Sequence, residues 1–470
     1  MLSHPALFMM SATKTASRHE IDMLNGPLLF KILLFTLPII GSSVLQTLFN
    51  TIDMIVVGHF VGDAAVGAVG TNTSLTSLVS SLFIGLATGT GACVSVAVGA
   101  RRERDVSDLV HTAMLTAVIG GVVLGVLGYF AAPFLLKNLM NVDESILGMA
   151  TDYIQVYFLG APALLIYNFG FAIMRTLGDT RRPLLYMLVA GLANVGFNLL
   201  FVLVFGLGVI GVALGTIISL AVSAVLVVFS LCRYQNACRL SLRRLRIVPR
   251  CLVDILRIGV PAGLRGMLFG ISNTMLQASV NSLGPAATSG NAAASSIESF
   301  LYLMVSAFGQ TATVFVGQNY GAGKHRRIRR VLLLCLALTT GVGIVAGVGA
   351  LLLREPLVAL YLPDAPASAL LAYERMVVVF GLYFLEGVFE TLAGALQGIK
   401  ISVAPTFVIV ASVCGLRLAW IFLLFPLAAF HSIGGLYACY PVSWAVTAIA
   451  LFFMILYFFP RKCPVRAGEE

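Results

Sequence analysis

Residues 47–62 read TLFNTIDMIVVGHFVG, and Asp53 is the one carboxylate in this apolar stretch. The apolar run begins near Leu28, so it is longer than the ~20 residues that cross a bilayer. An acid at membrane depth costs about 2.5 to 3.5 kcal/mol on insertion scales and usually faces a cavity or a polar partner. The stretch therefore predicts a membrane span in which Asp53 is turned away from lipid.

The composition excludes a soluble protein. Of 470 residues, 59% are hydrophobic and 11% are charged, whereas roughly a quarter of the residues are charged in typical soluble domains. The mean hydropathy is +0.98. The N-terminal segment before Leu28 is polar, carries Lys14 and Arg18 and lacks a cleavage site, so we expect no removable signal peptide.

Apolar runs separated by charges or by glycine and proline predict an all-α polytopic membrane protein with twelve transmembrane helices. The predicted spans are 28–58, 66–99, 107–135, 147–174, 183–205, 208–232, 253–283, 287–318, 331–352, 371–397, 401–427 and 432–459.

The basic residues fall in loops on one side of these spans, and the opposite loops carry little beyond Lys137 and Arg354. By the positive-inside rule, we expect both termini and the basic loops to be cytoplasmic, in a multi-pass protein of the cell (inner) membrane. This topology accounts for the net charge of +10 without nucleic acid. The basic positions are Arg101, Arg102, Arg104, Arg175, Arg181, Arg182, those in 233–250, those in 324–330, Lys400, Arg461, Lys462 and Arg466.

The two halves of the chain repeat each other at a nearly constant offset. TLPIIGSSV, with Pro38, aligns with IGVPAGLRG, with Pro261, and AIMRTLGDTRRP aligns with GALQGIKISVAP. Each half holds six spans, an even number, so both should have the same orientation, as in parallel-repeat transporters with a central cavity. The predicted segments are 1–27 (cytoplasmic), 28–232 (first lobe), 233–251 (basic linker), 252–459 (second lobe) and 460–470 (cytoplasmic tail).

Polar residues form a stripe inside the first lobe. Gln46, Asn50 and Asp53 follow i, i+4, i+7 spacing and share one helical face. A desolvated acid beside amides can take up a proton or coordinate Na⁺, although the amides could equally hold helices together at about 0.6 kcal/mol per contact. The residues of this predicted ion site are Gln46, Asn50, Asp53, Asn194, Asn198 and Thr216.

The second lobe carries more charge within its predicted spans. Glu386 and Glu390 are one turn apart and share a face, and Arg265, Glu298 and Arg417 lie in neighbouring spans. Two interpretations stay open here: a buried cluster of ion pairs that holds the lobe together, and a site that binds substrate or takes part in coupling. Tyr157 and Asn168 in the fourth span could likewise line a cavity or simply pack.

Motifs of enzymes are not found in the sequence. It contains no GxxxxGK[ST], GxSxG or HExxH pattern, and its eight cysteines form no CxxC pair. We therefore expect no catalytic residues, no cofactor and no dedicated metal site other than a possible Na⁺ at Asp53.

With these residues in hand, the chain resembles the multidrug and toxic compound extrusion (MATE) family from about residue 28 to 459. The resemblance rests on NTIDMIVVGHFVGDAAVGAVG, IMRTLGD, NVGFN, GVALGT and GQNYGAGKHRRI. It implies two six-helix lobes in a V, with alternating access. It also implies export of organic, often cationic and amphipathic compounds in exchange for H⁺ or Na⁺.

The resemblance also implies residue roles. Asp53 resembles the coupling carboxylate of the first span and Pro38 the proline at which that helix bends. Asn194 and Thr216 match polar positions of the first-lobe cation site, and Glu386 resembles the acid of the tenth span of some members. Two positions depart from the family: Asn198 stands where many members have a second acid, and Phe269 aligns near the seventh-span glutamate of some Na⁺-coupled members.

Two other functions compete with this interpretation. A flippase of lipid-linked saccharides would share the architecture but should place several cations in its cavity, where this sequence offers only Arg265 and Arg417. A structural or receptor membrane protein would leave the duplication and the intramembrane acids unexplained. We expect a monomer in contact with lipid whose partners are a small-molecule substrate and H⁺ or Na⁺, without nucleic acid.

Overall fold

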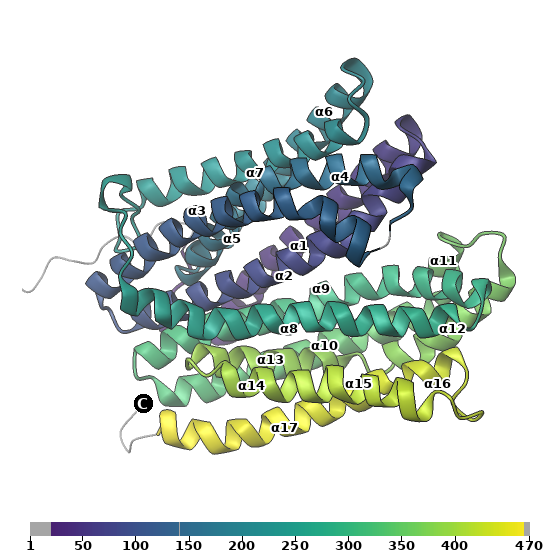
Figure 1. Ribbon diagram of the computed structural model, residues 1–470. Coiled ribbons are helices and arrows are strands. Elements are labelled where there is room, and N and C mark those ends of the chain that lie inside the picture. Colours follow the sequence, from purple (N-terminus) through teal and green to yellow (C-terminus); the bar gives the residue numbers. More distant parts are fainter. Residues whose placement is uncertain (1–19, 141, 465–470) are drawn as a thin grey trace, which may run out of the picture.

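The computed structural model describes residues 20–140 and 142–464, and in this part of the chain helices joined by turns and loops are the only regular secondary structure (Figure 1). Most of the predicted N-terminal segment and the end of the predicted tail, with Lys14, Arg18 and Arg466, lie outside the described residues. The first lobe consists of α1 (Leu28–Phe60), α2 (Asp63–Gly99), α3 (Glu103–Phe134) with η1 (Leu135–Leu139), α4 (Glu144–Leu159) with α5 (Ala161–Thr176), α6 (Arg181–Leu199) with η2 (Leu200–Val204), and α7 (Gly208–Arg233).

A segment that contains the short helix η3 (Leu242–Arg244) leads to the second lobe. That lobe consists of α8 (Pro249–Asn281), α9 (Pro285–Gly321), α10 (His325–Leu352) with α11 (Arg354–Ala359), α12 (Pro366–Phe380) with α13 (Phe384–Gly398), the segmented helix α14 (Val403–Ile409), η4 (Val410–Gly415), α15 (Leu416–Ala419) and η5 (Trp420–Leu424), and α16 (Ile433–Tyr437) with α17 (Cys439–Lys462).

Twelve helical units are long enough to cross a membrane. Among the described residues, nine helices are long and apolar enough to cross a membrane, and the pairs α4/α5 and α12/α13, bent by 49° and 44°, bring the number to eleven if each pair is one span. The twelfth is α8, which at 33 residues is about 50 Å long but carries polar residues such as Arg265, Asn273 and Gln277 along its length. The predicted fold class is confirmed.

The backbone itself shows the internal repeat. Three pairs of residues with a positive φ are related by one and the same offset along the chain: Gly62 and Gly284, Arg101 and Gly323, and Gly178 and Lys400. Each pair marks the same turn between equivalent helices of the two lobes. The bent pairs α4/α5 and α12/α13 are also equivalent, so the two lobes share their helix order and their irregularities.

The lobes meet at glycines on α2, α8 and α9. A Cβ added to Gly99 would lie 1.9 Å from the carbonyl oxygen of Gln318, and one added to Gly321 would lie 2.0 Å from that of Val96. These two contacts are equivalent under the internal repeat, and small residues allow helix backbones to approach this closely. Gly85 of α2 likewise packs on the backbone of α8.

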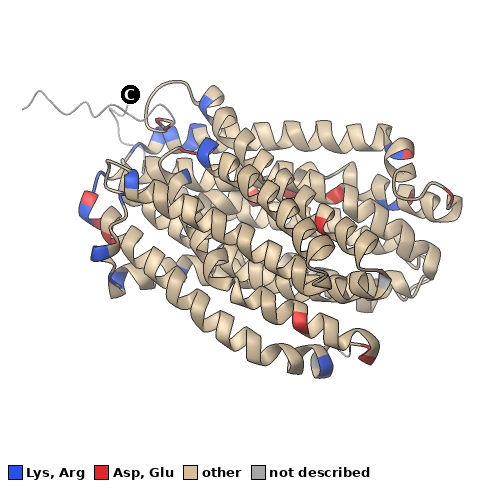
Figure 2. Ribbon diagram, turned by 90° about the horizontal axis from the view of Figure 1, so that it is seen from above, with Lys and Arg blue, Asp and Glu red and all other residues tan. Residues whose placement is uncertain are grey.

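These contacts place the lobe interface near one end of the molecule. Gly99 and Gly321 end the helices that lead into the basic turns, and most lysines and arginines gather at that end, here called the basic end (Figure 2). Toward the opposite end the two lobes diverge (Figure 1). The molecule is therefore a V that is closed at its basic end.

Residues 20–27, here called the N-terminal strap, join both lobes at the basic end. Met23 is fully buried, and its carbonyl oxygen accepts hydrogen bonds from Asn319 and Arg327 of the second lobe. Lys324 donates to the carbonyl oxygen of Leu24 at 2.8 Å. On the first-lobe side, the backbone of Ile21 packs against Gly178.

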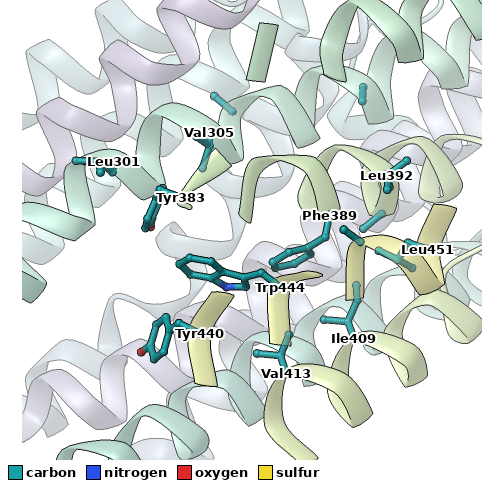
Figure 3. Packing of buried hydrophobic residues seen from close by; sticks show 14 of the residues in the cluster. Leu301, Val305, Tyr383, Phe389, Leu392, Ile409, Val413, Tyr440, Trp444 and Leu451 are labelled. Atoms are coloured by element: carbon teal, nitrogen blue, oxygen red, sulfur yellow. The ribbon is translucent and has the colours of Figure 1, made fainter. Parts of the chain in front are cut away.

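An aromatic cluster forms the core of the second lobe. Trp444 lies between Tyr383 and Tyr440, with ring centroids 5.2 and 5.4 Å apart, and Phe389 packs nearby (Figure 3). Trp444 is 1% exposed. The cluster joins α13, α17 and the residues that precede α13, and it forms one wall of the cavity described below.

The repeat predicts a stabilising substitution at Arg101. Its φ of 55° is strained for a residue with a Cβ, whereas Gly323 occupies the equivalent position. We expect Arg101→Gly to raise the free energy of unfolding by ~0.5 to 1 kcal/mol, because relief of strain exceeds the entropic cost of glycine. Thermal unfolding of the purified protein measures this effect. Arg101→Ala, which keeps a Cβ, is the control, and an equal gain in both variants would contradict the explanation.

Candidate ion site and substrate cavities

The first-lobe site is built around Asp53 of α1. Asn198 of α6 donates to Asp53 Oδ1 at 2.5 Å, and Asn194 donates to Oδ2 at 3.5 Å. Asn194 and Asn198 lie one turn apart on α6, which brings both amides to the same carboxylate. Within the described residues, no lysine, arginine or histidine lies within 4.0 Å of the Asp53 carboxylate, so its charge has only neutral partners.

A small cavity of about 70 Å³, lined in part by polar side chains, adjoins this carboxylate. Since one water occupies ~30 Å³ in the liquid, the cavity has room for a small ion with one or two waters rather than for an organic molecule. Five of the six residues predicted from the sequence for this site line the cavity: Gln46, Asn50, Asp53, Asn194 and Thr216. The sixth, Asn198, does not line it but is hydrogen-bonded to Asp53.

The small cavity borders a second pocket between the lobes. Gln46, Tyr167 and Met187 line both spaces, and Gln46 donates to the hydroxyl of Tyr167 at 3.4 Å. The second pocket, of about 100 Å³, is lined by α1, α2, α5 and α6 of the first lobe and α9 of the second. The polar residues around Asp53 are thus connected to the interface of the two lobes.

The predicted residues of the fourth span separate in the structure. Asn168 lines the pocket between the lobes, whereas Tyr157 stacks on Tyr153 at a centroid distance of 6.4 Å. Arg175, which the sequence placed in a basic loop, instead lies in the last turn of α5 and donates to Gln310 of α9 at 2.6 Å. The loop prediction was wrong for Arg175, because α5 extends to Thr176, beyond the predicted end of the span.

The second lobe encloses a larger cavity of about 500 Å³. Asn273, Glu298, Tyr302, Glu386, Arg417 and Tyr440 are among the residues that line it. Helices α8, α9, α12, α13, α15 and α17 contribute to its wall. This cavity is large enough for an organic molecule and combines aromatic rings with charges of both signs.

The charges of the second lobe form two ion pairs. Arg375 pairs with Glu298 and donates to the carbonyl oxygen of Asn291 at 2.8 Å. Arg265 pairs with Glu390 at 3.4 Å, and neither of these two lines the cavity. Arg375 was not among the residues predicted from the sequence, although an arginine inside a predicted span, next to Glu374, was a usable signal.

Glu386 has no such partner. It lines the cavity and is 6% exposed, and within the described part of the chain its carboxylate makes no hydrogen bond or ion pair. Sequence spacing placed Glu386 and Glu390 on one helical face, but the structure gives them different surroundings. Glu386 is therefore the acid available to a molecule in the cavity.

The described residues do not form a cluster of side chains suited to binding a metal ion. Residues 20–140 and 142–464 contain no group of three or more His, Cys, Asp or Glu that could hold a metal ion. All eight cysteines are free.

Two six-helix lobes with a parallel repeat, polar cavities and buried charges define a polytopic transporter fold. The sequence matches the MatE family twice, over residues 38–200 and 261–423, and the chain belongs to this family of multidrug and toxic compound extrusion transporters. The two matches fall one in each lobe.

Individual relatives cover most of the chain. It is 24% identical over 426 residues to the probable multidrug resistance protein YoeA of Bacillus subtilis (strain 168), which covers 89% of this chain and 91% of that protein. It is 26% identical over 451 residues to the FAD transporter of Shewanella oneidensis, with coverage of 91% and 92%. A solved outward-facing structure of a multidrug resistance MATE family transporter matches with a TM-score of 0.87, 19% identity and coverage of 96% and 100%.

The packing of the ion site predicts the effect of one methyl group. A Cβ on Gly215 of α7 would lie 1.9 Å from Asn198 Oδ1, so Gly215→Ala should displace the amide that donates to Asp53. We expect a loss of ~1 to 3 kcal/mol in the free energy of unfolding, as overpacking usually costs, together with slower transport. Gly196→Ala on α6, where no atom lies within 4 Å, is the matched control. Equal behaviour of the two variants would contradict this geometry.

Proposed function

We propose that the protein is a secondary active antiporter that exports organic compounds, chiefly cationic and amphipathic ones, in exchange for H⁺ or Na⁺. The observation that carries the proposal is the connection of the Asp53 cavity to the pocket between the lobes through Gln46, Tyr167 and Met187. An ion bound at Asp53 can thereby influence the surface on which the lobes must move.

The coupling follows from the surroundings of Asp53. Protonation or Na⁺ binding would neutralise a charge that only neutral groups now stabilise, and the packing of α1 against α6 would change. In the structure, α1 runs without a break through Pro38. Proline leaves the carbonyl four residues earlier without its helical donor, so we infer that α1 bends there when the ion site changes its charge.

Alternating access requires the basic end to open. We infer that this end is cytoplasmic in the cell (inner) membrane, since it gathers most lysines and arginines (Figure 2). Opening it would separate the paired glycine contacts and release the N-terminal strap from one lobe. For the two moving units we propose residues 28–232 and 252–459, joined by residues 233–251.

The proposal that the cargo is an organic cation rests on Glu386. A carboxylate without a protein partner in an aromatic-walled cavity favours an organic cation, which both a negative charge and ring faces attract. The names of the relatives refer to multidrug resistance and to FAD. A flippase is disfavoured because Arg265 and Arg375 are each paired with a glutamate, which leaves Arg417 as the one unpaired arginine in the cavity lining, where a pyrophosphate calls for several cations.

Neutralising Asp53 tests the coupling. We expect Asp53→Asn to abolish ion-driven export, because the amide can neither release a proton nor bind Na⁺ as a charged ligand. The measurement is export of a fluorescent cation from vesicles under imposed H⁺ or Na⁺ gradients. Equilibrium binding of the same dye shows that the variant is folded. Export at the wild-type rate with the same ion dependence would overturn the role of Asp53.

Two further variants test the cargo site. We expect Glu386→Gln to weaken binding of the cationic dye about tenfold, because it removes the charge that faces the cavity. Glu390→Gln should act mainly on thermal stability, because it leaves Arg265 without its partner. Both effects are measured on the purified protein. Unchanged dye binding in Glu386→Gln would mean that this acid is structural.

A further inference from the structure

A further cavity lies outside both transport sites, at the basic end of the molecule. It has a volume of about 650 Å³ and lies between the first turns of α3 and the residues that join the two lobes. The charged residues that line it are Glu103, Arg104, Arg239 and Arg244. Within the described part of the chain none of these four forms an ion pair within 4.0 Å, so three arginines and one glutamate give the cavity a net positive charge.

The neighbouring acids on α3 are paired outside this cavity. Asp105 pairs with Arg102 at 2.9 Å, and Asp108 pairs with Arg246 at 2.6 Å. None of these four residues lines the cavity. The acids nearest along the helix are therefore engaged with other arginines, and the cavity keeps its positive charge.

The segment that carries two of the cavity's arginines is fixed against α3. His111 is 3% exposed and accepts a hydrogen bond at Nε2 from the backbone N–H of Ser241 at 3.0 Å. The hydroxyl of Thr112 accepts from the N–H of Val248 at 3.1 Å. Between these two anchors, the N–H of Arg244 donates to the carbonyl oxygen of Ser241 at 2.9 Å. The backbone is thus held in the shape of the cavity before any ligand binds, which lowers the entropic cost of binding.

The lining of the cavity suits a phosphate group. Guanidinium groups bind phosphate through paired, charge-assisted hydrogen bonds, and Ser107 adds a hydroxyl to the same wall. Among the described residues that line the cavity there is no phenylalanine, tyrosine or tryptophan, so it offers no stack for the flat ring of a drug or a base. Its volume leaves room for a polar body beside the phosphate.

We propose that this cavity binds a phosphate group, carried by an anionic phospholipid or by a small phosphorylated molecule. The phosphate lies between Arg104 of α3 and the arginines at positions 239 and 244, and it ties the segment between the lobes to the first lobe. Because the basic end is cytoplasmic in the proposed topology, headgroups of the inner leaflet and soluble phosphates both reach the cavity. The site does not depend on which compound the protein exports.

Thermal unfolding of the full-length protein in a neutral detergent tests the proposal, because a ligand that binds the folded state stabilises it. The probes are glycerol 3-phosphate and dioctanoyl phosphatidylglycerol. The controls, at the same ionic strength, are glycerol and dioctanoyl phosphatidylcholine, whose choline cation the arginines repel. We expect a saturable rise in melting temperature with a phosphate probe and no rise with its control.

Variants locate the binding. Arg239→Gln/Arg244→Gln should raise the probe concentration for a half-maximal shift by about tenfold or more, because two charge-assisted contacts are lost. Arg243→Gln/Arg250→Gln is the matched control, since it removes the same charge from exposed arginines of this region that do not line the cavity. Arg104→Gln tests the α3 side separately and should also weaken binding. All five arginines are exposed, so the variants should fold.

The two probes distinguish the sources of the phosphate. A shift with the lipid alone means that the cavity holds a phospholipid headgroup, and a shift with glycerol 3-phosphate means that a soluble phosphate is sufficient. No shift with either probe, or an equal loss in the two double variants, overturns the phosphate site. Export of a cationic dye is measured in parallel, and its absence in the wild type would overturn the antiporter while a shift that depends on Arg239 and Arg244 would still support this site.

Discussion

A polar side chain at membrane depth must find a polar partner or a cavity, because lipid offers neither hydrogen bonds nor counter-ions. The interior of both lobes follows from this constraint. In the first lobe, one carboxylate is held by two amides beside a small cavity. In the second lobe, two arginines and two glutamates pair with each other, whereas Glu386 and Arg417 line a larger cavity without forming an ion pair.

The two lobes use one backbone for different chemistry. Their turns with positive φ coincide under the internal repeat, yet at the same offset Asp53 corresponds to Met275 and Asn198 to Trp420. In the reverse direction, Glu386 corresponds to Leu164 and Arg417 to Val195. Neither the polar site around Asp53 nor the second-lobe cavity is therefore duplicated. The repeat preserved helix packing at the interface while each interior acquired its own polar groups.

The sequence predicted the spans and the first-lobe stripe well, because hydropathy and helical spacing are local properties. Gln46, Asn50 and Asp53 share a face by their spacing alone, and the structure brings Asn194 and Asn198 to the same acid.

The second-lobe pairings could not be predicted in this way. Which glutamate pairs with Arg265 or Arg375 depends on how helices that are distant in sequence pack. Helical spacing predicts the same environment for Glu386 and Glu390, whereas the structure gives them different environments. The roles of these residues stay predictions.

The polar character of α8 has a consequence for how the protein is made. During synthesis each span must leave the translocation channel for the bilayer, and α8, with Arg265, Asn273 and Gln277, is a weak signal for that step by itself. Its closest partner is α2, whose Gly85 and Gly89 contact its backbone, and α2 is already in the membrane when α8 emerges. The completed first lobe can thus act as an intramolecular chaperone for the start of the second, which gives the order of the two lobes along the chain a physical meaning.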